Sequence, residues 1–469
     1  MKQTLDRFLQ SHVSGEKTTA KEKILGYLIG PSGCLVVNAV LATYLNLYYT
    51  DVLKLTGAFL VVLPFVSRVI DAVTNFIMGV ILDKTKTRFG KARPYILLSA
   101  IPFAVAAVLL VAVPQLSPAG QKIWVAVTYN IYYSIAFTMY NMSHLMMVPL
   151  STRDNKQRTQ LSVFNNIANV AVTGIIVALC MPILVEKVLG YEQEKWVAFM
   201  SVLSIVSVPF TIFEYLFTKE RITEEGGETA ANTVPVKTQL KAMFSNRYWL
   251  MIMAYQFAFT TYSTVHNLAI VYLARDVLGS ITYQSLISVI SGLPMGAGML
   301  CIIPLCNKFG KRKVSIVGYL LCILGGAVCL INPFNLIVIL IGLAIRYAGN
   351  VPSNYVTNAF FADVGEHIEW KNGFRTDGLN GSFLNVMMTL GMGVGQSLFN
   401  FLLNVGHYDA SLSEQLMSAK WAVIGADIIV PMVFGAFCCA IMYFFKIEKQ
   451  MPEISAEIKR RNGGKVNAE

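Results

Sequence analysis

The sequence predicts an all-α integral membrane protein with twelve membrane-spanning helices in two halves of six. Of its 469 residues, 55% are hydrophobic and only 14% are charged, whereas soluble chains carry about 25% charge. The apolar residues form continuous stretches of about twenty, the length that a helix needs to cross a bilayer. They lack the shorter alternating segments of a membrane β-barrel. The composition therefore excludes a soluble protein and leaves no room for a large extramembrane domain.

The predicted spans follow one another with short connections. They lie near residues 25–49, 57–80, 95–113, 122–147, 163–184, 196–218, 249–273, 283–306, 314–331, 334–359, 380–405 and 420–445. The longest connection, residues 219–248, separates a half of residues 1–218 from a half of residues 249–446, and residues 447–469 form a tail. We expect the connection and the tail to be cytoplasmic.

The basic residues predict the orientation. The net charge is +11, and 30 of the 38 Lys and Arg residues lie in segments that share a side with the two termini. Basic residues collect on the cytoplasmic side of membrane proteins, so we expect both termini in the cytoplasm and the protein in the cell membrane. Because the bases form short clusters between apolar stretches, they indicate topology, and we expect no nucleic-acid partner.

Two connections resemble each other at a distance of six spans. Residues 79–91 (GVILDKTKTRFGK) follow the second span, and residues 306–313 (CNKFGKRK) follow the eighth. Internal repeats of six spans are used by carriers that build a central site between two halves and expose it alternately to each side. The repeat therefore predicts an alternating-access transporter.

These residues also carry a family resemblance. The pattern G-x-x-x-D-[KR]-x-x-x-R-x-G-[KR] in residues 79–91 resembles the signature loop of the major facilitator superfamily. Residues 48–52 (YYTDV), 68–72 (RVIDA) and 363–375 (DVGEHIEWKNGFR) are similar to the glycoside-pentoside-hexuronide:cation symporters, the family of the melibiose permease. The resemblance runs from about residue 27 to residue 400 and implies a secondary transporter of glycoside-like solutes.

The chain departs from that family at most of its charged site positions. Where sodium-coupled members carry a second carboxylate in the second span, this sequence has Asn75. By the same resemblance, the family's acids in spans 1 and 4 fall on Leu35 and Asn141, and its basic residues in spans 5 and 11 fall on Asn166 and Thr389. The resemblance thus implies a retained scaffold, and we expect protons to be favoured over Na⁺ as the coupling ion.

Charged and polar residues share one face of the second span. Arg68, Asp71 and Asn75 are spaced i, i+3 and i+7, which places them within about 60° of one another on a helix. A charge at membrane depth costs at least about 2.5–3.5 kcal/mol unless it is paired or hydrated, so this face must point inward. We predict that Asp71 is the main proton-carrying residue with Asn75 beside it; the alternative is a static Arg68–Asp71 pair.

The fourth span carries an aromatic stripe that ends in a histidine. Tyr133, Phe137, Tyr140 and His144 share one face, with Asn141 at its edge. Aromatic rings with polar tips suit a sugar or another flat amphipathic ligand, and we predict substrate binding there. The alternative is aromatic packing between helices.

Uncharged hydrogen-bonding residues recur on other spans. Asn385 and Thr389 lie on one face of the eleventh span together with Gln396 and Asn400. Such a stripe lines a cavity or bonds neighbouring helices. We predict a neutral ligand bound by Asn38, Asn166, His266, Asn267, Asn385 and Thr389 in addition to the residues of the fourth span.

Charged residues near the span ends predict a gate. The predicted gating set consists of Asp83, Arg88, Asp363, Glu366, Glu369 and Arg375, together with Arg68 and Arg346 inside spans. For Arg346, the alternative is the binding of an anionic group. Exposed ion pairs contribute only about 0–1 kcal/mol each, so a network of them biases a conformational equilibrium without locking it. The alternative is charge that only sets topology.

No enzymatic motif, phosphate-binding loop or metal-ligand spacing occurs in the sequence. We therefore predict a non-enzymatic carrier without cofactor or metal, which moves a small neutral glycoside-like solute with protons through Asp71 and works as a monomer in the bilayer. The alternatives are a carrier of an amphipathic lipid- or steroid-like molecule, an uncoupled uniporter or exchanger and, more remotely, a membrane sensor that transports nothing.

Overall fold

The fold is known from a computed structural model. It describes residues 10–13, 15, 17–55, 58–85, 87–152, 154–169, 174, 176–221, 234–374, 376–412 and 414–466. No strand occurs among these residues. The chain forms two compact units: unit 1 consists of Met1–Gly227 and Asp409–Glu414, and unit 2 of Glu228–Tyr408 and Gln415–Glu469.

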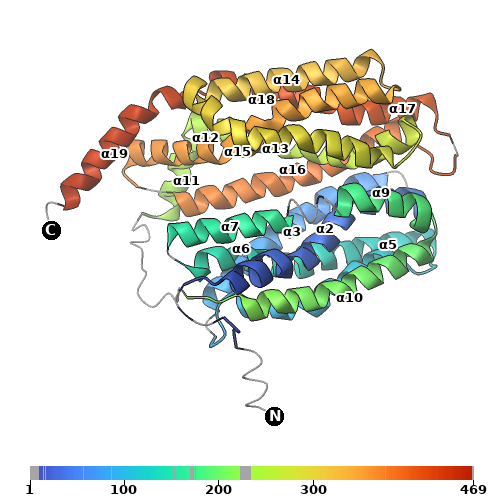
Figure 1. Ribbon diagram of the computed structural model, residues 1–469, viewed down its shortest axis with the longest axis horizontal. Helices are drawn as coiled ribbons and strands as arrows, with labels where there is room; N and C mark the ends of the chain where they lie inside the picture. Colours follow the sequence, from blue (N-terminus) through green and yellow to red (C-terminus); the bar gives the residue numbers. More distant parts are fainter. Residues whose placement is uncertain are drawn as a thin grey trace, which may run out of the picture. The chain divides into compact units, whose positions relative to one another are not determined.

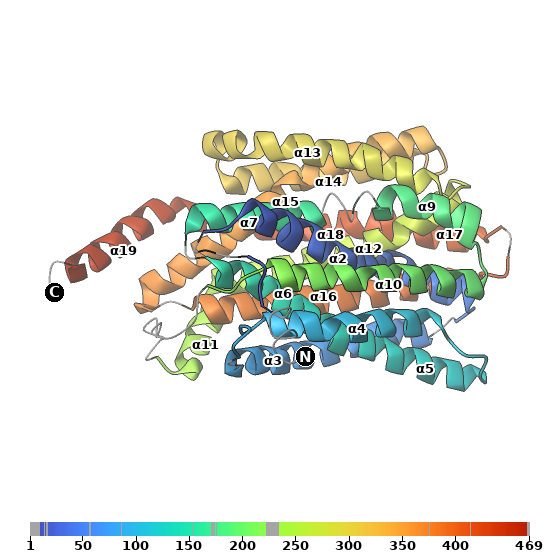
Figure 2. The same cartoon turned by 60° about the horizontal axis from the view of Figure 1, so that its bottom comes forward.

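Unit 1 contains the first six predicted spans. Its helical segments are η1 (Glu22–Ile29), α2 (Gly30–Leu47), η2 (Tyr48–Val52), α3 (Ala58–Lys84), α4 (Arg93–Val111), α5 (Pro118–Asn130), η3 (Ile131–Phe137), α6 (Thr138–Ser151), α7 (Asn155–Ile167), η5 (Ile176–Cys180), α9 (Met181–Leu184), η6 (Val185–Leu189) and α10 (Gln193–Phe217). Several spans are built from consecutive segments, as in η1–α2–η2 and α5–η3–α6. Helix α10 lies beside α4 and α2 (Figure 2).

Unit 2 contains the other six predicted spans. Its segments are α11 (Val236–Phe244), α12 (Arg247–Tyr272), η7 (Leu273–Val277), α13 (Tyr283–Phe309), α14 (Lys311–Ile331), α15 (Leu336–Asn372), α16 (Asp377–Val405), α17 (Met417–Ile424), η8 (Gly425–Ile429), α18 (Val430–Phe444), η9 (Ile447–Lys449) and α19 (Met451–Val466). Helix α14 lies along α15 and α18, and α19 leaves the bundle (Figure 1). The segments predicted as a connection and a tail thus contain the helices α11 and α19.

The predicted fold class and the twelve spans are confirmed, because the described residues of each predicted span lie, except at its ends, in a helix or a run of helical segments. Within the described residues, eight of these are long and apolar enough by composition alone to cross a membrane. The remaining four spans correspond to α5–η3–α6, α7 to η6, α12–η7 and α13. One of them, α12, contains polar residues such as Gln256, Thr260 and His266, which are buried in unit 2. These residues lower the mean hydropathy of this helix.

Glycines let some helices approach closely. On α14 and α15, Gly325 faces Gly342, and a Cβ atom at Gly342 would lie 2.6 Å from the Gly325 carbonyl oxygen. On α2 and α10, a Cβ atom at Gly30 would lie 2.6 Å from the Cβ of Glu214. Small residues at such crossings are a general means of packing helices in membranes, where the hydrophobic effect does not draw helices together. These contacts fix the helix backbones that carry the buried charged residues.

The two related connections have the same structure at their ends. In unit 1, Gly90 has φ +114°, and the Glu220 carboxylate, beyond the end of α10, accepts hydrogen bonds from the next three backbone N–H groups, including Arg93 N at 2.9 Å. The Arg93 guanidinium in turn donates to the Tyr215 carbonyl at 2.8 Å. An acid at the positive end of α4 is stabilised by the helix dipole.

Unit 2 repeats this arrangement with one residue fewer between the glycine and the arginine. Gly310 has φ +86°, the Glu448 carboxylate accepts from Lys311 N at 2.7 Å and Arg312 N at 3.0 Å, and the Arg312 guanidinium donates to the Met442 carbonyl at 2.9 Å. In each unit, the acid that follows the last span caps the third span. The predicted six-span repeat therefore extends to individual hydrogen bonds.

Candidate functional site

The predicted polar face of the second span forms a buried centre in unit 1. Asp71 on α3 is only 6% exposed. Its carboxylate accepts hydrogen bonds from Arg68 Nη1 at 3.2 Å, Asn75 Nδ2 at 3.3 Å and Thr138 Oγ1 at 3.0 Å. The structure thus brings Arg68, Asp71 and Asn75 together as their spacing predicts. Thr138, at the start of α6, is the one partner of this centre that the spacing does not reveal.

The guanidinium of Arg68 has unused hydrogen-bonding capacity. It lies 5.0 Å from the centre of the Tyr133 ring, a cation–π distance. Its Nε has no hydrogen-bond partner within the described part of the chain, and neither has the hydroxyl of the preceding residue, Ser67, or that of Tyr49. Buried polar groups without partners are costly. These atoms are themselves buried, so water or a solute hydroxyl group would have to enter this part of unit 1 to bond them.

The residues of the aromatic stripe in the fourth span contact different partners. Tyr133 lies against Arg68, as described, whereas Phe137 packs on Phe103 at a ring distance of 6.3 Å. Tyr140 and His144 face a different residue, Glu214 on α10, which is 1% exposed. A helical stripe predicts which residues share a face but not what packs against each of them.

Glu214 is held by two hydrogen-bonding residues of α6, one of which also contacts α7. The Tyr140 hydroxyl donates to Glu214 Oε2 at 2.7 Å, and His144 Nδ1 lies 2.6 Å from Glu214 Oε1. The other ring nitrogen of His144, Nε2, lies 3.0 Å from Asn165 Oδ1 on α7. This acid–histidine pair is separate from the Asp71 centre.

Unit 2 has a buried charged centre of its own. His266 Nδ1 on α12 lies 2.6 Å from Asp427 Oδ1 on η8, and His266 Nε2 lies 2.5 Å from the Tyr347 hydroxyl. Arg346 on α15 donates from Nη1 to the Asp427 carbonyl at 2.5 Å, and the same Nη1 is 3.8 Å from Asp427 Oδ2. Arg346 was predicted as a gating residue, but the structure places it in this centre and not with the charged residues at the helix ends.

A cavity of about 140 Å³ opens beside this centre within unit 2. It is large enough for several water molecules. Amides, aromatic rings and the charged centre line it: Phe259, Tyr262, Ser263, His266, Asn267, Met295, Arg346, Tyr347, Asn350, Asn354 and Pro431. His266 and Asn267 were predicted as substrate-binding residues, and the structure places both at this cavity.

The other five predicted substrate-binding residues are not hydrogen-bonded to these centres in the described part of the chain. Asn38, Asn141 and Thr389 are half-buried, and Asn166 and Asn385 are exposed. In the part of the chain that the structure describes, no hydrogen bond joins these five side chains to Asp71, Glu214 or Asp427.

A comparison of the sequence with protein-family models decides the family. Residues 26–449 match the model described as "MFS/sugar transport protein". The chain belongs to the MFS sugar transport family. The match covers the twelve spans, and the resemblance to the glycoside-pentoside-hexuronide:cation symporters within the superfamily is confirmed.

Curated relatives of this MFS sugar transporter are similar over nearly their whole length. The isoprimeverose transporter of Lactiplantibacillus pentosus is 28% identical over 443 residues, which cover 93% of this chain and 91% of the relative. The putative glycoside/cation symporter YagG of Escherichia coli K12 is 28% identical, with 96% and 97% covered.

Solved structures show the same fold at low identity. A D-xylose-proton symporter has a TM-score of 0.63 at 16% identity, with 92% of this chain and 98% of that chain covered. The nucleoside transporter NupG has a TM-score of 0.58 at 13% identity, with 91% and 97% covered. The protein is therefore a multi-pass membrane transporter with the major facilitator fold.

The structure describes the surroundings of some of the predicted gating residues of this MFS transporter, and the side chains of the others lie outside the described residues. Asp363 on α15 pairs with Lys311 at the start of α14, with a distance of 2.5 Å from Nζ to Oδ2. The exposed guanidinium of Arg88 lies 4.6 Å from the centre of the Phe89 ring. Glu366 and Glu369 are half-buried on the same helix as Asp363. The side chain of Asp83, and all of Arg375, lie outside the described residues.

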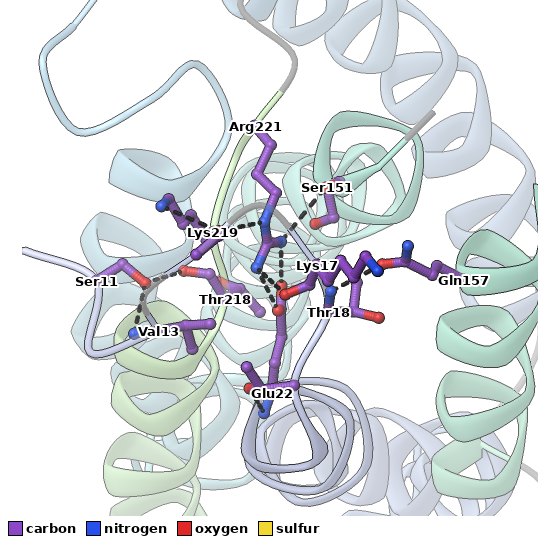
Figure 3. Close-up of polar contacts among 12 residues, drawn as sticks. Ser11, Val13, Lys17, Thr18, Glu22, Ser151, Gln157, Thr218, Lys219 and Arg221 are labelled. Carbon is purple, nitrogen blue, oxygen red and sulfur yellow. Dashed lines mark hydrogen bonds and ion pairs between the residues drawn. The ribbon is translucent and has the colours of Figure 1, made fainter. Parts of the chain in front are cut away.

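Another network of unit 1 has no counterpart among the predicted residues. Arg221, beyond α10, forms two hydrogen bonds with the fully buried Glu22, from Nη1 at 2.8 Å and from Nη2 at 2.7 Å, and donates to the Ser151 carbonyl at 3.3 Å. Thr18 N donates to Gln157 Oε1 at 2.8 Å. Figure 3 shows Arg221 reaching between Ser151 and Glu22. We call these residues the Glu22–Arg221 network.

Three acids of this MFS transporter escaped the sequence reasoning: Glu22, Glu214 and Asp427. Glu214 and Asp427 each interrupt an apolar stretch, in the sixth and the twelfth span. That position was the available signal, because an acid in a span costs energy unless it has a partner. The role of Asp71 as the main proton-carrying residue stays a prediction, and the structure adds these buried acids to the titratable groups inside the protein.

Proposed function

We propose that the protein is a secondary active transporter that carries a neutral glycoside-like solute through the cytoplasmic membrane by alternating access, with protons coupled through Asp71. Both termini are cytoplasmic and a monomer is sufficient. Membership of the MFS sugar transport family supports the mode of transport. The names of the relatives, which include an isoprimeverose transporter and a putative glycoside/cation symporter, support the class of solute.

The observation that carries the proposal is that Arg68 bonds Asp71 and has a further N–H group with which it can bond a solute. Its Nη1 donates to the buried carboxylate of Asp71 at 3.2 Å, while its Nε has no hydrogen-bond partner in the described residues. When Asp71 takes up a proton, its ion pair with Arg68 is lost. The guanidinium then binds the hydroxyl groups of a solute more strongly, and proton binding and solute binding favour each other.

The solute is neutral because the buried charges are already compensated. Arg346 is paired with Asp427, so the cavity of unit 2 presents no uncompensated cation to an anionic substrate. Its amides and aromatic rings suit a molecule with hydroxyl groups and apolar ring faces. A sodium site would need several oxygen ligands, whereas Asp71 supplies the one carboxylate and is bonded by the donors of Arg68 and Asn75.

The test is uptake into proteoliposomes that contain the purified protein. Radiolabelled isoprimeverose is the first probe, under an imposed pH gradient or an imposed Na⁺ gradient. We expect accumulation with the pH gradient alone. Asp71→Asn should lower it at least tenfold while solute exchange without a gradient continues. The matched control is Asp409→Asn in the connection before α17, which should leave accumulation unchanged.

The outcomes separate the parts of the proposal. Accumulation driven by Na⁺ alone would refute proton coupling. Unchanged accumulation in Asp71→Asn would refute the role of Asp71. Failure of isoprimeverose, xylosides and glucosides alike to exchange would refute the class of solute.

A further inference from the structure

We propose that Glu214 and His144 form a second proton-binding site in unit 1, and that it carries its proton in the conformation described here. The proposal rests on the proposed proton-coupled transport. It adds a site with partners other than those of the Asp71 centre, although both centres use residues of α6. Glu214 belongs to α10 and His144 to α6, whereas Asp71 belongs to α3.

The hydrogen bonds of His144 define its proton content. Nδ1 lies 2.6 Å from Glu214 Oε1, and Nε2 lies 3.0 Å from the amide oxygen of Asn165. Both partners are acceptors, and a neutral imidazole has only one N–H group. With the Asn165 amide in this orientation, a ring that satisfies both acceptors carries two protons and is an imidazolium.

The bonds of Glu214 fit an ionised carboxylate. Oε1 accepts from His144, and Oε2 accepts from the Tyr140 hydroxyl at 2.7 Å. The pair is therefore a buried salt bridge, with side-chain exposures of 4% for His144 and 1% for Glu214. A buried ion pair needs such additional hydrogen bonds, because the loss of hydration otherwise exceeds the attraction between the charges.

The site depends on the relative positions of three helices. Glu214 lies on α10, Tyr140 and His144 on α6, and Asn165 on α7. If α7 moves away, the imidazolium loses an acceptor. If α6 moves away from α10, the ion pair opens. Each movement lowers the affinity of His144 for its second proton, so proton binding is linked to the conformation of the unit.

The surrounding elements supply few other charges. Cys34 of α2 lies 3.0 Å from the Thr211 hydroxyl, and Tyr27 of η1 bonds the Met147 carbonyl at 3.2 Å. On the α4 side, the Arg93 guanidinium is held by the Tyr215 carbonyl. The net charge of the site is therefore governed by Glu214 and His144.

The end of the site toward residue 221 is closed by packed groups. Gly30 lets α2 lie against the backbone of Glu214, and the Tyr27 hydroxyl is hydrogen-bonded to Ser151. Ser151 also supplies a carbonyl to the Glu22–Arg221 network (Figure 3).

The chemistry points to a proton and not to a metal ion. The pair offers one carboxylate and one imidazole, and the described residues contain no group of three or more His, Cys, Asp or Glu side chains placed to hold a metal. Both nitrogens of His144 are engaged with acceptors, which leaves no lone pair for a cation.

The first test reads the protonation of His144 directly and needs no solute. The purified protein is labelled with ¹⁵N-histidine. The chain has five histidines, and His144→Gln assigns the signal. We expect both ring nitrogens of His144 to be protonated at pH 8, where a histidine with the usual pKa of about 6.5 is almost entirely neutral. A neutral His144 at pH 7 in the unmodified protein would overturn the proposal.

Three variants complete this test. Glu214→Gln should convert His144 to the neutral ring at pH 8. Asn165→Leu should lower its proton affinity at least tenfold, and it provides the measurement if Glu214→Gln does not fold. The matched control is Glu192→Gln at the other end of α10, where the Glu192 side chain is 66% exposed and pairs with Lys195; it should leave His144 unchanged. An unchanged His144 in both Glu214→Gln and Asn165→Leu contradicts the site.

The second test measures isoprimeverose uptake against external pH. Glu214→Gln and Asn165→Leu should shift the midpoint of the pH profile by at least one unit, whereas a residue with a structural role alone would lower the rate at every pH equally. Unshifted midpoints overturn the role in transport. If isoprimeverose and related glycosides are not transported at all, the proposed function fails, while the protonation of His144 still decides whether the site exists.

Discussion

The charged centre of unit 2 allows a quantitative prediction for Asp427→Asn. Arg346 is fully enclosed with its Nη1 3.8 Å from Asp427 Oδ2. With an effective dielectric constant of about 20, two charges at this distance attract each other by about 4 kcal/mol. Removal of one partner of a buried ion pair costs about 3–5 kcal/mol in measured cases. Because the substitution keeps the backbone carbonyl that accepts from Arg346, we expect a loss near the lower end, about 3 kcal/mol, or about a hundredfold in the unfolding equilibrium.

The comparison with Arg346→Gln makes this prediction specific. Without Arg346, the carboxylate of Asp427 still has His266 Nδ1 at 2.6 Å, and this ring can take up a proton and replace the lost cation. Arg346→Gln should therefore cost less than Asp427→Asn, and the double variant should recover most of the loss because it leaves no unpaired charge. The measurement is reversible unfolding of the purified protein in detergent micelles with increasing SDS. Equal midpoints for the unmodified protein and Asp427→Asn would refute the reasoning, as would a double variant that is no more stable than Asp427→Asn.

Three further predictions concern packing and the ends of the helices. Gly342→Ala should destabilise the protein by about 1–3 kcal/mol, since the new methyl group would lie 2.6 Å from a carbonyl oxygen of α14. Thermal unfolding measures this. The control is Gly296→Ala, whose methyl group would meet nothing within 4 Å. Glu448→Ala should cost about 1–2 kcal/mol in the same assay, as for other helix-capping residues, and an unchanged midpoint would show that the cap of α14 is dispensable. Arg221→Gln leaves the fully buried carboxylate of Glu22 without its cation and should lower the free energy of unfolding by about 3–5 kcal/mol. Faster proteolysis before residue 22 is a second measurement, and Arg221→Lys should recover part of the lost stability.

The sequence predicted those parts of the site that depend on local geometry. Arg68, Asp71 and Asn75 meet because they are one and two turns apart on one helix, and helical geometry alone determines this. The repeat of residues 79–91 and 306–313 was visible because each copy is continuous in sequence. The acids that cap these copies, Glu220 and Glu448, were not visible, since they come from 127 and 136 residues farther along the chain.

The buried acid–histidine pairs could not be predicted for the same reason. Glu214 and His144 are 70 residues apart, and Asp427 and His266 are 161 residues apart. Hydropathy shows that such acids are unusual in a span, but it does not show which residues they pair with. The stripe through Tyr140 and His144 was therefore interpreted as a solute surface, whereas both side chains bind Glu214.

The buried charges of both units lead to one conclusion about coupling. Asp71 is paired with Arg68, Glu214 with His144, and Asp427 with Arg346. In a medium of low polarity, each pair is stable only while both charges are present. A change in the proton content of one of these pairs therefore makes or breaks a contact between side chains, and in the pairs of Glu214 and Asp427 that contact joins two different helices. In the proposed proton-coupled transport, protonation would thereby change how the helices pack. This reasoning expects that replacement of both members of the His144–Glu214 pair by Gln preserves folding, permits solute exchange in proteoliposomes and removes the contribution of this pair to the pH profile, so that the titration of Asp71 remains; a double variant that retains the original pH profile would contradict it.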